Sequence, residues 1–239
     1  MRRQCLVTGG NRGIGLEFVR QLLQRDDHVV ATCRKPGTAT ALNALAGEYP
    51  GRLHVLPLDV ADAKSRATLA GELPLVLGED ADGAPVKLDL LINNAGVLHS
   101  GEKFGFVEQD VLEHSLRTNA AGPLLLAQSL APLLADGGSL ANISSQLGSI
   151  ANTTRFGTPS YAISKAAQNM ASMLLAHALA ARRIKVLALH PGWVQTDMGG
   201  TSATVAPSDA VRGLLGVIDA ATPAQSGSFL DWRGETLPW

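Results

Sequence analysis

The residues of this chain best suited to chemistry are a phenol and an ammonium group four positions apart, in Tyr161-Ala-Ile-Ser-Lys165. On a helix, side chains at this spacing lie on one face, one turn apart. A free phenol has a pKa of about 10, and a nearby cation favours the phenolate and lowers that pKa. A tyrosine tuned in this way can act as a general acid or base near neutral pH. Two unrelated surface residues are the alternative, so the pair needs support from the rest of the chain.

Apolar runs and helical segments alternate along the whole chain, and these elements must position the pair. The runs are short and almost continuously apolar, which is typical of parallel strands covered on both faces. We expect strands over 5–7, 28–33, 53–57, 88–93, 139–144, 185–190 and 227–230. We expect helices over about 13–25, 38–48, 63–77, 109–117, 119–134 and 160–182. Right-handed crossovers then predict a single doubly wound α/β domain over residues 1–239, with a mostly or fully parallel seven-stranded sheet.

Composition excludes several classes of protein. The chain has 239 residues, of which 46% are hydrophobic and 17% charged, so it is globular and not disordered. The near balance of 20 Lys plus Arg against 21 Asp plus Glu gives no reason to expect nucleic acid or a membrane surface as a partner. Cys5 and Cys33 lie in apolar runs without His or Cys at ligand spacing, so no metal site is expected. Because no secretory signal or membrane span is recognisable, we expect a cytoplasmic location.

A glycine-rich turn follows the first expected strand, in Thr8-Gly-Gly-Asn-Arg-Gly-Ile-Gly15. Gly9, Gly13 and Gly15 have a G-x-x-x-G-x-G spacing, which permits a tight turn. The helix that begins there offers free N–H groups and the positive end of its dipole to a pyrophosphate. An ordinary glycine-rich turn is the alternative, but the position at the first strand–helix junction favours a dinucleotide cofactor.

The charge at the end of the second strand bears on which nicotinamide cofactor binds. An acidic residue there would accept hydrogen bonds from the adenosine ribose of NAD. Here the strand ends in Arg34, followed by Lys35. Arg34 is placed to pair with a 2′-phosphate, and Arg12 in the glycine-rich turn can approach the same group. Two cations and no carboxylate predict NADP(H), with solvated loop charges as the alternative.

Two further strand ends offer groups to the same cofactor. Asp59, after the third strand, can accept a hydrogen bond from an adenine amino group, and is equally suited to cap the next helix. Asn93-Asn-Ala-Gly96, after the fourth strand, has small residues that let a cofactor approach the backbone closely. A plain turn is the alternative there.

The fifth and sixth strands end in groups suited to a substrate and a nicotinamide. The run Asn142-Ile-Ser-Ser145 lacks a G-x-S-x-G context, so we interpret a serine there as a hydrogen-bond donor to a carbonyl oxygen and not as a nucleophile. Pro191 and Gly192 end the sixth strand sharply. Backbone groups near Val194 and the Thr196 hydroxyl are then free to bind a carboxamide. Ligands of such sheets lie beyond the carboxyl ends of the strands, so these groups can converge.

Taken together, the motifs resemble those of the short-chain dehydrogenase/reductase family over nearly the whole chain, and most closely the C-factor and sniffer-type carbonyl reductases. The matching residues are Thr8, Gly9, Gly13, Gly15, Asn93-Asn-Ala-Gly96, Asn119, Ser145, Tyr161, Lys165 and Pro191-Gly192. The subgroup is indicated by a spacing of 16 residues between Ser145 and Tyr161, by the segment 191–200 and by the tail 227–239.

The resemblance implies a role for each matching side chain. Tyr161 is the implied proton donor in reduction and acceptor in oxidation, and Lys165 holds the nicotinamide ribose and lowers the Tyr161 pKa. Ser145 polarises the substrate carbonyl, with Ser144 as the alternative because of extra residues near 152–155. Asn119 supports a water-linked proton relay to Lys165. The residues expected to contact NADP(H) are Gly9, Asn11, Arg12, Gly13, Ile14, Gly15, Arg34, Asp59, Val60, Asn93, Ala95, Gly96, Tyr161, Lys165, Pro191, Gly192, Val194 and Thr196.

We therefore expect an NADPH-dependent carbonyl reductase that moves hydride between nicotinamide and a carbonyl or alcohol carbon. A sensor or signalling protein that binds NADP with little turnover is the alternative. The expected substrate is an aldehyde, ketone or quinone of moderate size in a largely apolar pocket, lined by Leu98, Gln146, Leu147, Phe156, Trp193 and Met198. Ala-rich helical faces and the resemblance predict a homodimer or homotetramer.

Overall fold

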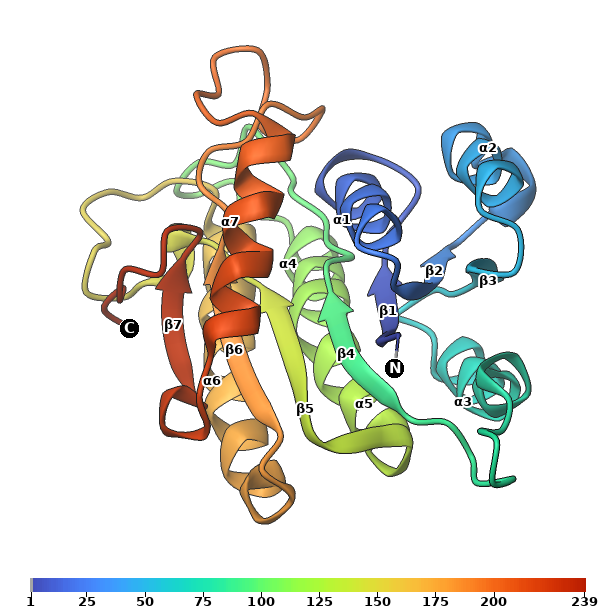
Figure 1. The fold of residues 1–239 in the computed structure, drawn as a ribbon. Coiled ribbons are helices and arrows are strands. Elements are labelled where there is room, and N and C mark those ends of the chain that lie inside the picture. Colours follow the sequence, from blue (N-terminus) through green and yellow to red (C-terminus); the bar gives the residue numbers. More distant parts are fainter. Residues whose placement is uncertain (1) are drawn as a thin grey trace.

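The computed structural model describes residues 2–239 and contains one sheet in which all seven strands are parallel (Figure 1). The strands are β1 (Gln4–Thr8), β2 (His28–Cys33), β3 (Leu53–Pro57), β4 (Leu88–Asn93), β5 (Leu134–Ile143), β6 (Lys185–His190) and β7 (Ser228–Asp231). Their order in space is β3-β2-β1-β4-β5-β6-β7. The predicted doubly wound parallel sheet is confirmed, and the strand order reverses between β1 and β4, where such sheets bind their ligands.

Helices cover both faces of the sheet. One face carries α1 (Gly13–Gln24), α2 (Thr40–Glu48) and α7 (Pro207–Ala220). The other carries α3 (Ala63–Leu77), α4 (Gln109–Leu116), α5 (Gly122–Leu130) and α6 (Pro159–Leu179). Each strand therefore needs apolar side chains on both sides, which explains the almost continuous apolar runs of the sequence.

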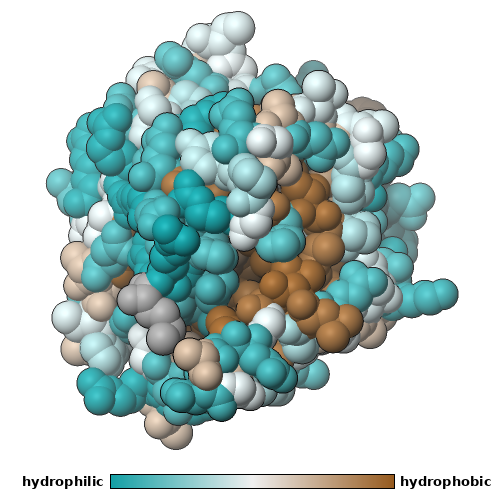
Figure 2. Space-filling model, turned by 45° about the vertical axis from the view of Figure 1, so that its right-hand side comes forward, coloured by the Kyte–Doolittle hydropathy of each residue, from teal (hydrophilic) through white to brown (hydrophobic). Residues whose placement is uncertain are grey.

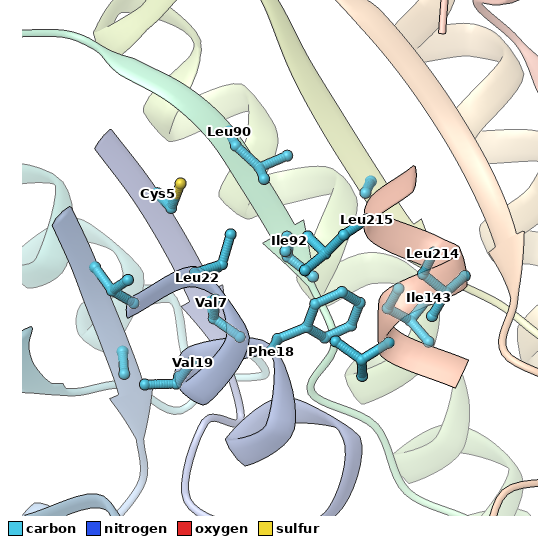
Figure 3. Packing of buried hydrophobic residues seen from close by; sticks show 14 of the residues in the cluster. Cys5, Val7, Phe18, Val19, Leu22, Leu90, Ile92, Ile143, Leu214 and Leu215 are labelled. Carbon is cyan, nitrogen blue, oxygen red and sulfur yellow. The ribbon is translucent and has the colours of Figure 1, made fainter. Parts of the chain in front are cut away.

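Neighbouring residues of β1 show how the strands serve two cores. Cys5 and Val7 are buried in the core beneath α1 and α7, whereas Leu6 is buried in the opposite core. This alternation follows from the two-residue repeat of a strand. In Figure 3, Phe18 of α1 lies in the space between the sheet and α7, beside Ile92. Full burial of a side chain of this size contributes about 1.5–3 kcal/mol, so this packing fixes α1 on the sheet.

The predicted helix over 119–134 and strand over 139–144 are wrong in their boundaries. A π-helical turn, Arg117–Ala121, joins α4 to α5, and β5 already begins at Leu134. Leu134 pairs with Leu88, and the register then shifts before Ser139 pairs with Leu90. The shift accommodates the intervening Asp-Gly-Gly residues, with Gly137 at a φ of 76°. Their turn-like composition concealed the first half of the strand.

The face of the molecule drawn in Figure 2 is mostly hydrophilic but not uniform. Figure 2 shows apolar side chains gathered in one area beside a hydrophilic region, on the side of the molecule where β2, β3 and α3 lie in Figure 1. Within residues 2–239, none of the helices combines the length and the hydropathy needed to span a bilayer. Cys5 and Cys33 are buried, unbridged thiols.

Candidate active site

Tyr161 and Lys165 lie on one face of the first turns of α6, as predicted. Their exposed fractions are only 8% and 4%. The Lys165 Nζ atom is 5.6 Å from the centroid of the Tyr161 ring. Pro159 occupies the first turn of the helix, where its missing N–H costs nothing, and Thr158 precedes it in a left-handed conformation. The two side chains thus face the same buried region beyond the end of β5.

The end of β5 distinguishes the two candidate serines. The side chain of Ser145 lies close enough to the Tyr161 hydroxyl to lower its pKa. Ser144 faces the other way, and its Oγ donates to Asn169 Oδ1 at 2.6 Å. Of the two serines, only Ser145 therefore lies beside the Tyr161 hydroxyl, in agreement with the sequence-based preference for it over Ser144.

Lys165 is held by two neutral acceptors. Its Nζ donates to the Ile143 carbonyl oxygen at 2.7 Å and to Gln168 Oε1 at 2.9 Å. Among residues 2–239, no carboxylate forms an ion pair with it. Burial lowers the pKa of Lys165 to about 7. Sequence reasoning missed Gln168, although its position three residues after Lys165 on the same helix was a usable signal.

The expectation that Lys165 lowers the pKa of Tyr161 is wrong for this arrangement. Burial raises the Tyr161 pKa to about 12, and the neighbouring Ser145 side chain opposes that rise only in part. A buried lysine with a pKa near 7 is only partly charged at neutral pH, so it does little to stabilise a phenolate. The phenol consequently keeps its proton at neutral pH, which suits a proton donor.

Asn119 lies in the π-helical turn between α4 and α5, an irregularity that is frequent at functional sites. It is fully buried. Its side chain accepts from Val97 N at 2.8 Å and donates to the Val97 carbonyl at 2.8 Å and to Ser164 Oγ at 2.9 Å. It also lies close to Gly96, where a Cβ would come within 3.2 Å of Asn119 Oδ1 and 3.8 Å of Lys165 Nζ. Asn119 thus ties the segment after β4 to α6, beside Lys165.

The glycine-rich turn has the backbone that an anion site needs. Gly9 and Gly13 have φ values of 67° and 53°, which side-chain-bearing residues rarely adopt. Within the described chain, no side chain caps the N-terminus of α1, so its first N–H groups are free for a ligand. Asn94, which belongs to the predicted motif but was not expected to contact the cofactor, braces the turn by donating to the Thr8 carbonyl at 2.9 Å.

Replacing Gly15 with Ala is expected to destabilise the protein by about 1–3 kcal/mol through overpacking. A Cβ at this position would lie 2.2 Å from the Gly9 carbonyl oxygen and 2.4 Å from Asn94 Nδ2. Urea unfolding measures the effect. The matched control is Gly47→Ala in α2, where a Cβ meets nothing within 4 Å and should stabilise the helix by about 0.5–1 kcal/mol. Equal unfolding free energies for the two variants would contradict this account of the turn.

The charged residues expected near the cofactor differ in their surroundings. Arg34 is exposed and has no ion-pair partner in residues 2–239. Arg12 instead pairs with Asp197, with 3.2 Å between Nη1 and Oδ2, and both side chains are largely exposed. Asp59 does not cap α3, because the residue in that position is Asp62, whose side chain accepts from Lys64 N. The helix-cap alternative for Asp59 is therefore wrong.

The segment after β6 crosses toward the glycine-rich turn. Gly192 turns the chain with a φ of 83°, and Val194 then pairs with Val205. Thr196 reaches the turn, since its Cγ2 would be 3.4 Å from a Cβ on Gly13. The structure thus brings the segments that follow β1 and β6 close together.

The structure adds detail to two predictions, the cofactor contact of Asn93 and the apolar lining of the substrate pocket. The Asn93 side chain is buried and its Nδ2 donates to Asn142 Oδ1 at 2.8 Å, so this amide group is engaged within the fold. Leu147, Phe156, Trp193 and Met198 are substantially exposed, in keeping with an open apolar wall. No cluster of three or more His, Cys, Asp or Glu suited to a metal occurs in the described residues.

Comparison with known proteins identifies the family. The family model described as short chain dehydrogenase matches residues 3–205. The chain belongs to the short-chain dehydrogenase family. This short-chain dehydrogenase is 34% identical over 238 residues to the 1-hydroxy-2-glutathionyl-2-methyl-3-butene dehydrogenase of Rhodococcus, covering 98% of both chains. It is 42% identical over 154 residues to the C-signal of Myxococcus xanthus, covering 64% of this chain and 93% of the relative.

Solved structures of short-chain dehydrogenases share the whole fold. The carbonyl reductase Sniffer of D. melanogaster superposes with a TM-score of 0.93 at 32% identity, and both chains are covered completely. The NADPH-bound carbonyl reductase from chicken fatty liver superposes with a TM-score of 0.92 at 37% identity, again with complete coverage of both chains. The family predicted from the sequence motifs is confirmed.

Because Lys165 is buried, we expect the free energy of unfolding of this short-chain dehydrogenase to depend on pH. The unfolded chain keeps the lysine proton up to a pKa of about 10.5, whereas the folded protein releases it near a pKa of about 7. Unfolding therefore takes up a proton between these values, so the free energy of unfolding rises with pH, by at most about 1.4 kcal/mol per pH unit. Lys165→Met should lack this contribution. Urea unfolding of both proteins at pH 7 and pH 9.5 tests it, and a stability difference that does not change with pH would contradict it.

Proposed function

We propose that this short-chain dehydrogenase is an NADP(H)-dependent oxidoreductase that transfers hydride between nicotinamide and a carbonyl or alcohol carbon. The observation that carries the proposal is the buried Tyr161 side chain, with Lys165 Nζ 5.6 Å from its ring centroid and Ser145 beside its hydroxyl. A protonated phenol next to a second hydroxyl is suited to hold and then protonate a carbonyl oxygen.

The residues beyond the carboxyl ends of the strands fit a dinucleotide. The uncapped N-terminus of α1 and the glycines before it suit a pyrophosphate. Arg34, unpaired within residues 2–239, suits a 2′-phosphate, as does the lack of a carboxylate at the end of β2. Asp59 and Val60 would lie at the adenine, and the segment from Pro191 to Thr196 at the nicotinamide. The NADPH in the similar chicken carbonyl reductase supports this choice of cofactor.

Each polar side chain then has a task in reduction. When bound, NADPH supplies the hydride for the carbonyl carbon. Ser145 donates a hydrogen bond to the carbonyl oxygen, and Tyr161 gives its proton to that oxygen. Lys165 orients the cofactor's ribose, and Asn119 holds the segment after β4 against α6 so that Lys165 stays in place. In oxidation the same phenol takes the proton back.

A signalling role with little turnover is the second candidate, favoured by the similarity to the Myxococcus C-signal. Against this role, the four side chains of the proposed proton-transfer group, Asn119, Ser145, Tyr161 and Lys165, lie together. A protein that only binds NADP does not require this arrangement. The test is NADPH oxidation, followed at 340 nm with a panel of apolar aldehydes, ketones and quinones, and repeated with NADH. We expect turnover with NADPH and much weaker turnover with NADH. Tight NADPH binding without turnover on any member of the panel would favour the signalling role.

We also propose that the protein forms a homo-oligomer through α5 and α6. Met170 and Leu174 of α6 are 62% and 56% exposed, and Leu125 of α5 is 36% exposed. Light scattering coupled to gel filtration tests this, and a monomer at micromolar concentration would contradict it.

A further inference from the structure

Two segments of chain that are distant in sequence meet at the start of α6. The segment 97–107 follows β4, and the segment 149–158 precedes α6. Glu102 joins the first of these segments to the first turn of α6, where its carboxylate accepts two hydrogen bonds from Ser160. Ser160 N donates to Oε2 at 3.3 Å, and Ser160 Oγ donates to Oε1 at 2.5 Å. Ser160 is fully buried and immediately precedes Tyr161.

The Glu102 carboxylate supplies the hydrogen-bond acceptor and the negative charge that the N-terminus of α6 lacks in its own sequence. The first N–H groups of an α-helix have no partner within the helix and carry partial positive charge. Within the described chain, Thr158 makes no capping hydrogen bond, and the first turn of α6 contains no acidic residue. Glu102, 58 positions earlier in the sequence, provides both the acceptor and the negative charge. The contact is charge-assisted, which makes it stronger than a bond between neutral groups.

A second contact joins the segment 97–107 to the segment 149–158. Phe104 and Phe156 lie edge to face, with 5.5 Å between ring centroids and an interplanar angle of 90°. Both rings are mainly exposed, at 84% and 54%, so they contact each other without being part of a core. Glycines at 101 and 105 have φ values of 89° and 85°, so the backbone around these contacts is not stiffened by side chains. The position of the segment 97–107 therefore depends on its few side-chain contacts.

We propose that Glu102 is a positioning residue that latches the segment 97–107 onto the first turn of α6 and so sets the opening through which a substrate reaches Tyr161. The segment is held at its start, where Asn119 binds Val97, and continues into α4 at Gln109. The latch itself is a property of the fold, and only its effect on substrate rests on the function proposed above. Loss of the carboxylate frees the middle of the segment and loosens the turn that carries Tyr161.

Native-state trypsin digestion tests the latch without any substrate. Lys103 and Arg155 are exposed and lie next to the two phenylalanines, so each segment carries its own cleavage site. Cleavage of a transiently opened segment follows the population of the open form. With one charge-assisted contact removed, we expect Glu102→Ala to be cut after Lys103 about tenfold faster or more. Glu102→Gln, which keeps an acceptor but not the charge, should be intermediate.

The matched control is Glu108→Ala, which removes the same charge six positions later, at the N-cap of α4, where the Glu108 side chain makes no capping bond. It should be cut after Lys103 at the wild-type rate, as judged by mass spectrometry of the fragments. An unchanged rate in Glu102→Ala, or an equal acceleration in Glu108→Ala, overturns the proposal. On an active carbonyl substrate, Glu102→Ala should raise KM while leaving the NADPH Kd unchanged. Faster cleavage in a protein without turnover would support the latch and count against the proposed function.

Discussion

Replacing Tyr161 with Phe is expected to lower the rate of carbonyl reduction by about 10²–10⁴-fold, the usual contribution of a general acid. The change removes one oxygen and leaves the buried ring in place beside Lys165. NADPH affinity should stay the same, because the phenol hydroxyl acts on the substrate oxygen. Steady-state kinetics and NADPH fluorescence titration measure the two quantities.

Tyr49→Phe is a matched control, because Tyr49 is the only other tyrosine of the sequence. Its ring lies under the Arg52 guanidinium at 5.0 Å, after the end of α2 and outside the residues assigned to the site. It should retain wild-type kinetics. A Tyr161→Phe enzyme with the wild-type rate would remove this hydroxyl from the mechanism, and parallel losses of turnover and NADPH binding would show that it acts on the cofactor and not on the substrate oxygen alone.

Replacing Arg34 with Ser is expected to weaken NADPH binding by about 10- to 100-fold, which corresponds to the loss of a charged hydrogen-bonded contact of about 1.5–3 kcal/mol. NADH lacks the 2′-phosphate, so its affinity should hardly change. Fluorescence titration with both cofactors provides the comparison. The expected consequence is an enzyme that no longer distinguishes strongly between them.

Arg12→Ser tests whether the second cation contributes equally. Arg12 is already paired with Asp197, so bringing it to a phosphate requires breaking that exposed contact, and its loss should cost less affinity than the loss of Arg34.

A similar loss of NADH and NADPH affinity in Arg34→Ser would show that Arg34 supports the loop and does not select the cofactor.

The parts of the structure that follow from local sequence pattern were predictable. The continuous apolar runs indicated a parallel sheet, and the spacing of Tyr161 and Lys165 placed both on one face of α6. The structure at Asn119 was not predictable in the same way. A π-helical turn has no sequence signature comparable to a helix cap, so the chain from 109 to 134 was expected to be ordinary helix.

Contacts between distant segments account for the remaining differences. Glu102 as a partner of Ser160 depends on side-chain directions that no spacing rule gives, because 58 positions separate the two residues. The Tyr161 pKa was misjudged for a related reason. Sequence reveals a neighbouring cation, but it does not reveal that both groups are buried and that the loss of water outweighs the effect of the cation.

A ribosome delivers these strands in an order that lets the sheet grow outward. β2 adds to β1 and β3 adds to β2, so one half of the sheet can assemble while the rest is still being synthesised. β4 then returns to the open side of β1, and β5, β6 and β7 each extend the edge left by the strand before. A nascent chain can therefore complete its glycine-rich turn well before α6 has left the exit tunnel, and acquires its proton-transfer group only late in translation.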